Sequence, residues 1–250
     1  MRKGIMLLAA AAMISAAVSA QNVETIIVAG APNGRFSSMG TDCTIQGTVQ
    51  NGKKEGTWIE YYTGDNYLPK RIVNFHEGKK NGAYIEIDKT GSITKQAEYK
   101  DDELNGQVCV WFRGGRLSKM NTYKMGVMDG RQIQCYEKGG VQEESVYLNG
   151  ERHGVATWYD ENGAKLMTIE YSKGSFEGKQ QIYYANSGRV KSLRTYKNNM
   201  QDGPMVEYYD NGSVKSEAVY KNGKLSGKVK TYEKQETPAS SKAEKPREKK

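Results

Sequence analysis

The sequence predicts an all-β fold, an elongated antiparallel meander of about eight 24-residue β-hairpin repeats that form a single twisted sheet. Three observations predict it. A glycine and an aromatic residue recur at one spacing, runs of six to eight residues are rich in Tyr, Val, Ile and Thr, and Asn-Gly pairs stand between runs. Such runs have the length and composition of strands. Asn-Gly supplies the positive φ angles of a tight hairpin turn.

A period of 24 residues runs through most of the chain. Recurring glycines are separated by 26, 24, 24, 24, 24, 25 and 24 residues, and recurring aromatics by 24, 24, 24, 24, 25 and 24. Because two independent landmarks keep one period, the chain is an internal repeat. The landmark glycines are Gly56, Gly82, Gly106, Gly130, Gly154, Gly178, Gly203 and Gly227. The landmark aromatics are Phe75, Tyr99, Tyr123, Tyr147, Tyr171, Tyr196 and Tyr220.

Each repeat is expected to contain two strands. The first run begins at the landmark glycine and carries aromatics at the fifth and sixth positions after it, as in residues 178–184. A polar turn follows, often with Asn-Gly, as at Asn162-Gly163. The second run ends on the landmark aromatic, and a second turn, such as residues 149–154, leads to the next repeat.

Residues 1–20 have the pattern of a secretory signal peptide. Arg2 and Lys3 form a basic start, an apolar run follows, and small residues precede Gln21. The apolar run is shorter than the ~20 residues that span a membrane. We expect cleavage after Ala20 and, because Gln21 is not Cys, no lipid anchor. The mature protein is then expected to be soluble and either periplasmic or extracellular.

Three further regions follow the predicted signal peptide. Residues 21–50 are expected to cap the first repeat, with short strands at 26–28 and 44–49, and residues 51–233 form the repeat domain. Residues 234–250 hold six basic and three acidic residues and no large apolar one, so they are expected to be a disordered basic tail. Loss of the signal peptide lowers the formal charge from +8 to +6. This charge forms no clustered stripe, so nucleic acid is not an expected partner.

The repeat unit resembles the bacterial variant of the MORN repeat. Its pattern is Gly-x4-Tyr-Tyr-x2-Gly-x-x-Lys-x4-Tyr-x-Asn-Gly-x3-Gly, with clear copies at 154–178 and 203–227, and the resemblance covers about residues 51–233. It implies β-hairpin sheets that act as scaffolds or binding surfaces, and the antitoxin-like label of some relatives implies inhibition of a partner protein. The first repeat departs from the pattern by a longer turn at 64–66, and Asp88 and Asp160 replace the second aromatic.

The two faces of the predicted sheet differ because strand residues alternate between faces. The third and fifth positions after the landmark glycines, such as Ile59, Ile85 and Ile133, are expected to form the packing face. The opposite face carries aromatics that either pack across strands or bind a partner. These candidate binding residues are Trp58, Tyr62, Tyr84, Phe112, Tyr136, Trp158, Tyr184 and Tyr209.

No catalytic, metal or cofactor site is predicted. Glycine is about 11% of the chain without a three-residue period, which excludes collagen, and three Cys exclude a disulfide-dense mini-protein. The stretch 174–180 lacks the spacing and the Ser/Thr of a P-loop. His76 and His153 are expected in separate turns, and Cys109 and Cys135 too far apart for a disulfide.

The expected function is therefore a non-enzymatic exported scaffold that mediates protein–protein interaction in the cell envelope. Two alternatives stay open: a binder of cell wall or anionic lipid, suggested by the aromatic face and the basic tail, and an antitoxin-like inhibitor of a partner toxin. The expected partner is another envelope or secreted protein, with possible contact to a cell-wall or membrane surface. Neither a small-molecule substrate nor a cofactor is expected.

Overall fold

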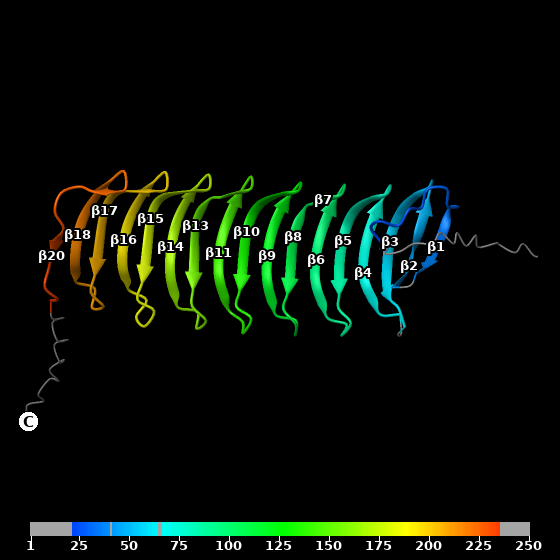
Figure 1. The fold of residues 1–250 in the computed structure, drawn as a ribbon, viewed down its shortest axis with the longest axis horizontal. Helices are drawn as coiled ribbons and strands as arrows, with labels where there is room; N and C mark the ends of the chain where they lie inside the picture. Colours follow the sequence, from blue (N-terminus) through cyan, green and yellow to red (C-terminus); the bar gives the residue numbers. More distant parts are fainter. Residues whose placement is uncertain (1–21, 41, 65–66, 236–250) are drawn as a thin grey trace, which may run out of the picture. The chain divides into compact units, whose positions relative to one another are not determined.

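The computed structural model describes residues 22–40, 42–64 and 67–235 (Figure 1). The predicted signal peptide lies outside the described residues, as does nearly all of the predicted basic tail. Every regular element in the described residues is a strand, and none is a helix long and apolar enough to cross a membrane. The chain divides into two compact units between Val127 and Met128, and each is described by itself.

Unit 1 is an antiparallel meander in which each strand pairs with its neighbours in the chain (Figure 1). The short β7 and the following β8 both pair with β6. Its strands are β1 (Gly34–Met39), β2 (Cys43–Gln50), β3 (Lys53–Tyr62), β4 (Pro69–His76), β5 (Lys79–Ile87), β6 (Ile93–Lys100), β7 (Glu103–Leu104), β8 (Gly106–Trp111) and β9 (Leu117–Lys124).

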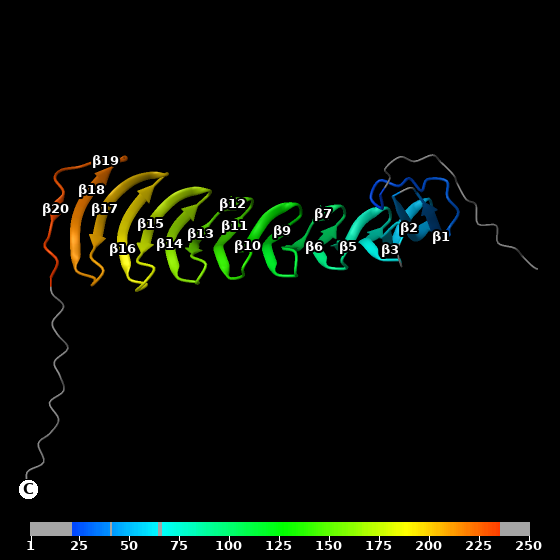
Figure 2. The same cartoon turned by 60° about the horizontal axis from the view of Figure 1, so that its bottom comes forward.

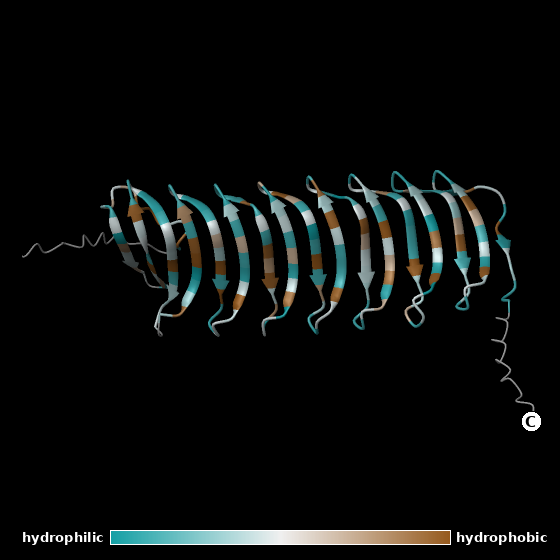
Figure 3. Ribbon diagram, turned by 180° about the vertical axis from the view of Figure 1, so that it is seen from behind, coloured by the Kyte–Doolittle hydropathy of each residue, from teal (hydrophilic) through white to brown (hydrophobic). Residues whose placement is uncertain are grey.

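Unit 2 repeats the same plan (Figure 1). Hydrophobic and hydrophilic residues alternate along its strands, as along those of unit 1 (Figure 3). The strands are β10 (Val127–Cys135), β11 (Val141–Leu148), β12 (Glu151–Arg152), β13 (Gly154–Tyr159), β14 (Lys165–Ser172), β15 (Ser175–Tyr183), β16 (Val190–Lys197), β17 (Met200–Tyr208), β18 (Val214–Lys221), β19 (Lys224–Leu225) and β20 (Lys230–Thr231). The predicted all-β antiparallel meander of hairpins is confirmed.

The two sequence landmarks are cross-strand partners. Gly82 lies directly opposite Tyr99, and Gly154 lies directly opposite Tyr171. The same pairing joins Gly56 to Phe75, Gly106 to Tyr123, Gly130 to Tyr147, Gly178 to Tyr196 and Gly203 to Tyr220. An aromatic ring beside a glycine covers backbone that has no side chain of its own. The common period of the two landmarks therefore reflects one contact made once per hairpin.

The turns between repeats are tighter than expected. Asn149 and Gly150 have φ angles of 50° and 85°, which suit a two-residue hairpin turn. Glu151 and Arg152 already pair with the preceding strand, so the predicted turn over residues 149–154 is wrong. The landmark glycine at 154 is instead an irregularity within the strand region, with φ of 73°.

Asp88 and Asp160 close the turns within their repeats. Asp160 Oδ1 accepts hydrogen bonds from the backbone N–H groups of Asn162 and Ala164, at 2.9 and 2.8 Å. Asp88 Oδ1 accepts the corresponding bonds from Thr90 and Ser92. Aspartate commonly mimics a backbone turn in this way. The two departures from the repeat pattern thus exchange an aromatic ring for a side-chain cap.

The buried face is the opposite of the predicted packing face. We use the name landmark face for one side of the sheet. This side carries the landmark aromatics and the residues at the second and fourth positions after each landmark glycine. Trp58, Glu60, Val73 and Ala97 lie on it and are each 0% exposed. At the third and fifth positions Ile133 is buried, whereas the other residues are half-buried or exposed. The prediction failed because the aliphatic third and fifth positions suggested a core, whereas the opposite face carries a glutamate, Glu60, whose charge is neutralised by ion pairs with Lys70 and Arg71.

Residues 22–31 supply the cover of the landmark face in unit 1. Val23, Ile26, Val28 and Ala31 are buried in one cluster with core residues of the repeats. Figure 2 shows this segment crossing one side of β2 and β3. The expected strand at 26–28 is wrong, since these residues form no ladder, whereas the expected strand at 44–49 lies within β2.

Candidate binding face

An aromatic cluster anchors the covered landmark face of unit 1. Trp58 is fully buried, and the centre of its ring lies 5.4 Å from the ring centre of Phe36 and 6.3 Å from that of Phe75. Its indole N–H donates a hydrogen bond to the carbonyl of Thr48. A Cβ added at Gly47 would overlap the indole. The backbone of β2 therefore approaches Trp58 as closely as glycine alone permits.

Charged side chains of the repeats hold the covering segment by its backbone. Lys54 Nζ donates to the carbonyls of Val23 and Glu24 at 2.7 and 2.8 Å, and lies 4.8 Å from the Phe75 ring centre. Burial lowers the pKa of Lys54 to about 8. Glu60 accepts the N–H of Val23 at 3.2 Å. The segment is thus recognised through main-chain groups as well as apolar side chains.

Three polar groups of the repeats surround the Glu24 carboxylate. Lys80 Nζ lies 3.1 Å from it and Arg71 Nη1 lies 3.6 Å from it. The Tyr84 hydroxyl, whose shorter hydrogen bond goes to Glu86, lies 3.4 Å from it. Burial and a hydrogen bond to Glu86 raise the pKa of Tyr84 far above its usual range, so it remains a donor at neutral pH. The landmark face of unit 1 therefore binds a carboxylate beside an apolar side chain.

The same face in unit 2 combines buried residues, such as Ala156 and Ile169 at 1% and 4% exposure, with half-buried aromatics around Arg152. Its guanidinium carbon lies 5.5 to 5.9 Å from the ring centres of Tyr147, Trp158 and Tyr171. Its Nη2 lies 2.5 Å from Glu143, whereas the buried Nη1 has no hydrogen-bond partner among the described residues. Burial disfavours the charged guanidinium, but the hydrogen bond and charge of Glu143 outweigh it and raise the pKa of Arg152.

Arg152 occupies the same register as the cations that hold the segment in unit 1. Each lies two residues before a landmark glycine, as Lys54 and Lys80 do. In the ladder, Arg152 lies opposite the landmark Tyr147, as Lys80 lies opposite Phe75. In the sequence alone, no single residue at the second position before a landmark glycine indicated a functional role. Aligning the second residue before each of the eight landmark glycines places a cation at three positions, 54, 80 and 152.

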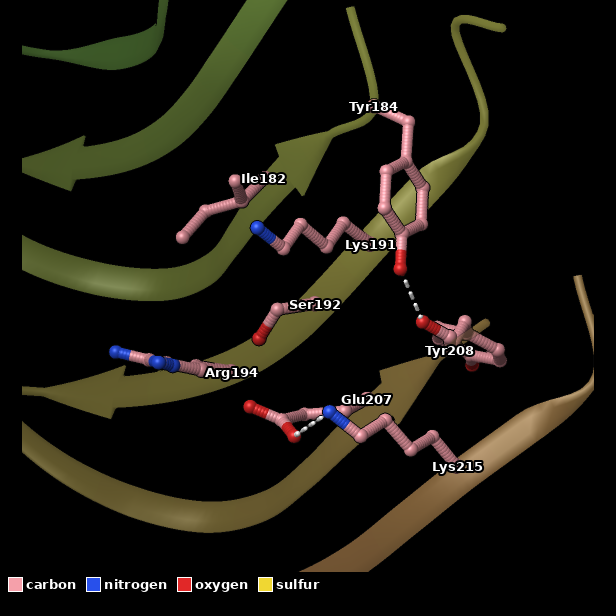
Figure 4. Close-up of a pocket in the computed structure, with 8 residues that line it drawn as sticks. All are labelled: Ile182, Tyr184, Lys191, Ser192, Arg194, Glu207, Tyr208 and Lys215. Atoms are coloured by element: carbon pink, nitrogen blue, oxygen red, sulfur yellow. Dashed lines mark hydrogen bonds and ion pairs between the residues drawn. The ribbon is translucent and has the colours of Figure 1, made fainter. Parts of the chain in front are cut away.

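A pocket of about 260 Å³ lies farther along the landmark face of unit 2 (Figure 4). Its walls come from β15, β16, β17 and β18 and the ends of these strands. Ile182, Tyr184, Lys191, Ser192, Arg194, Glu207, Tyr208 and Lys215 line it. Its polar part consists of Ser192, Arg194 and Glu207 of the landmark face together with Lys191 and Lys215. Sequence inspection did not single out this group.

The predicted binding aromatics have different environments. Trp58 and Tyr84 are 0% and 4% exposed, so the expectation that they offer a surface is wrong; the covering segment buries both. Trp158 is half-buried beside Arg152, and Phe112 is half-buried in unit 1. The other four are half-buried tyrosines at the sixth position: Tyr62, Tyr136, Tyr184 and Tyr209.

The four sixth-position tyrosines join neighbouring repeats. Tyr184 donates its hydroxyl to the carbonyl of Tyr208 at 2.9 Å, and Tyr209 donates to that of Tyr232 at 3.0 Å. The remaining bonds run from Tyr62 to Ile87 at 2.9 Å and from Tyr136 to Tyr159 at 2.7 Å. Each acceptor is the fifth residue after the next landmark glycine. These hydroxyls therefore have a structural partner, while their rings remain partly accessible.

The cysteines and histidines take no part in the interactions described on the landmark face. Cys109 and Cys135 are half-buried thiols whose pKa values burial raises. His76 Nδ1 lies 3.0 Å from Glu55, which raises the pKa of His76. His153 uses its backbone N–H to bond Val146. Within the described ranges, no group of three His, Cys, Asp or Glu side chains is placed to hold a metal ion.

A family model described as a MORN repeat variant matches the chain at residues 152–173 and 201–222. The MORN repeat is thus supported at these two places. Both matches lie in unit 2, and both begin two residues before a landmark glycine and end at the first residue of a tight turn. MORN repeats are commonly protein- or membrane-binding modules. No curated protein matches the chain.

Proposed function

We propose that this chain is a non-enzymatic, exported scaffold that binds another protein through the landmark face of unit 2. One observation carries the proposal. The face that residues 22–31 bury in unit 1 recurs in unit 2 with half-exposed aromatics around Arg152. Partly accessible Trp, Tyr and Arg side chains are the residue types enriched at the energetic centres of protein interfaces.

Export and envelope location belong to the same proposal. They are supported by the basic start, apolar run and small residues of positions 1–20. The MORN repeat type is compatible with a scaffold role. A partner in the periplasm or outside the cell follows from this placement.

The test compares two adjacent side chains on opposite faces of β13. Tagged full-length chain is cross-linked in its native cell, and recovered proteins are quantified by mass spectrometry. We expect Trp158→Ala to reduce recovery of a stoichiometric partner at least tenfold, and the matched control Tyr159→Ala to leave recovery within twofold. Equal recovery with both variants would refute binding through the landmark face.

A second candidate function is binding to an anionic lipid or cell-wall surface. The +6 mature charge and the basic residues 234–250 favour it, since each Lys or Arg near an anionic membrane contributes up to ~1 kcal/mol. Deletion of 236–250 is expected to weaken binding to phosphatidylglycerol vesicles without changing recovery of the protein partner. If the deletion abolishes recovery and Trp158→Ala does not, surface binding replaces protein binding as the function.

A further inference from the structure

We propose that the pocket of unit 2 formed by Ser192, Arg194, Glu207, Lys191 and Lys215 binds the carboxylate of a Glu or Asp side chain on the partner protein. The inference rests on the proposed function and names the chemistry that the landmark face recognises.

The pocket carries an excess of positive charge. Lys191, Arg194 and Lys215 line it against one acidic residue, Glu207, which gives two excess positive charges. Glu207 lies 4.0 Å from Lys215 and accepts a hydrogen bond from Ser216. Figure 4 shows Lys215 reaching Glu207, whereas Lys191 and Arg194 extend from β16 to the other side of it. The cations of β16 therefore favour an anionic ligand.

Two polar atoms in the pocket wall have no hydrogen-bond partner among the described residues. They are Ser192 Oγ and Arg194 Nε, both buried. Ser192 is 4% exposed. A buried donor without a partner is costly, so a ligand that accepts both hydrogen bonds would stabilise the site. A carboxylate has two acceptor oxygens and suits an arginine and a hydroxyl donor.

Unit 1 contains an occupied site of related composition. There Arg71, Lys80 and Tyr84 surround the Glu24 carboxylate while Val23 is fully buried beside it. Two residues of the unit 2 pocket have the same register as Glu60 and Lys70, an ion pair of unit 1 whose glutamate accepts the N–H of Val23. Glu207 and Glu60 are each fourth after a landmark glycine, and each pairs with a lysine five residues before the landmark aromatic of its hairpin.

The ligand is therefore expected to combine an acidic side chain with a neighbouring apolar one. Ile182 and Tyr184 supply apolar surface at one end of the pocket. The Tyr184 hydroxyl is already committed to the carbonyl of Tyr208, and Lys191 Nζ lies 5.7 Å from the centre of its ring. A Val-Glu sequence, like that of the covering segment, matches both parts of the pocket.

The test uses the peptide acetyl-Val-Glu-Thr-amide, its Gln counterpart and inorganic phosphate as probes of the full mature chain. Binding is followed by the NMR shifts of backbone amides 190–194 and 206–208. We expect the Glu peptide to bind at least tenfold more tightly than the Gln peptide. Arg194→Gln is expected to abolish this preference, whereas Arg131→Gln, which removes an exposed charge outside the pocket, preserves it.

The outcomes separate this inference from the proposed function. Equal binding of the two peptides, no binding at these amides, or tighter binding of phosphate than of the Glu peptide would overturn the carboxylate site. In each case the Trp158→Ala comparison still decides whether the landmark face binds a protein. Conversely, a carboxylate site sensitive to Arg194→Gln stands even if partner recovery does not depend on Trp158.

Discussion

The landmark faces of units 1 and 2 are built on one register and are used differently. In unit 1 residues 22–31 cover the face, and Trp58, Val73 and Ala97 are fully buried. In unit 2 Trp158 and Tyr171 remain half-buried around Arg152. A repeated hairpin therefore offers a similar surface several times, and the chain's own N-terminal segment has covered one of these surfaces. The difference teaches what kind of ligand such a face accepts.

The largest difference is expected between Trp58→Ala and Trp158→Ala. Removing a fully buried Trp costs about 3–5 kcal/mol, because both transfer energy and a cavity are involved. Removing the half-exposed Trp158 should cost less than about 2 kcal/mol, since less apolar area is buried. Urea unfolding of each variant, followed by far-ultraviolet circular dichroism, measures the difference. Equal losses would mean that the two faces are equally covered.

The two register-equivalent glutamates provide the next comparison. Glu60→Gln leaves Lys70 and Arg71 near an uncharged buried partner, which is expected to cost about 3 kcal/mol. Glu207→Gln affects a partly exposed pair and should change the free energy of unfolding by less than about 1 kcal/mol. The same urea titrations measure both. A cost at Glu207 as large as that at Glu60 would show that the pocket of unit 2 is covered.

A pH dependence distinguishes the cations of the two faces. Lys54 has a pKa of about 8 in the folded state against 10.5 when unfolded, so between these values the unfolded chain binds more protons. Stability therefore increases with pH in this window, by about 1–2 kcal/mol between pH 8 and 10. Below about pH 7 both states are protonated and the contribution of Lys54 to the slope vanishes.

Lys54→Met should remove this slope, which urea titrations at pH 7, 8, 9 and 10 would show. Arg152→Met is the matched control in unit 2, because an arginine with a raised pKa stays charged throughout the range. Loss of the slope in the Arg152 variant, or its survival in the Lys54 variant, would contradict the assignment.

The smallest effects are expected at the tyrosines that join repeats. Tyr62→Phe in unit 1 and Tyr184→Phe in unit 2 each remove one hydrogen bond to a backbone carbonyl, worth about 0.5–1.5 kcal/mol. Because the acceptor is main chain in both cases, the losses should agree within about 0.5 kcal/mol. A clearly larger loss in one unit would indicate that the hydroxyl has a further role there.

The repeat plan could be predicted from the sequence because it depends on local chemistry. Glycine, Asn-Gly and recurring tyrosines specify turns and strands wherever they occur, and the pairing of Gly154 with Tyr171 makes their common spacing visible. The tight turns were misplaced by a few residues because Glu151 and Arg152 are polar, although strands at a hairpin end tolerate such residues. Local pattern therefore decides the architecture more reliably than the ends of its elements.

The choice of buried face could not be predicted in the same way. It depends on residues 22–31, which are distant in sequence and form no ladder, and on neutralisation of Glu60 by Lys70 and Arg71. A glutamate on an alternating strand suggests solvent unless its partners are known. The candidate site was missed for the same reason, because Arg152 and Arg194 become significant only when the strands are placed in register.

The hydrogen bonds from tyrosine hydroxyls to the next repeat affect how such a chain can lengthen by gene duplication. Each bond ends on a main-chain carbonyl, so any inserted copy offers a suitable acceptor whatever its own side chains are. Each copy also brings a landmark glycine together with its aromatic partner within one hairpin. A duplicated or deleted 24-residue segment therefore leaves neighbouring copies able to rejoin. Side chains on the exposed face are then free to diverge from copy to copy while the fold is retained.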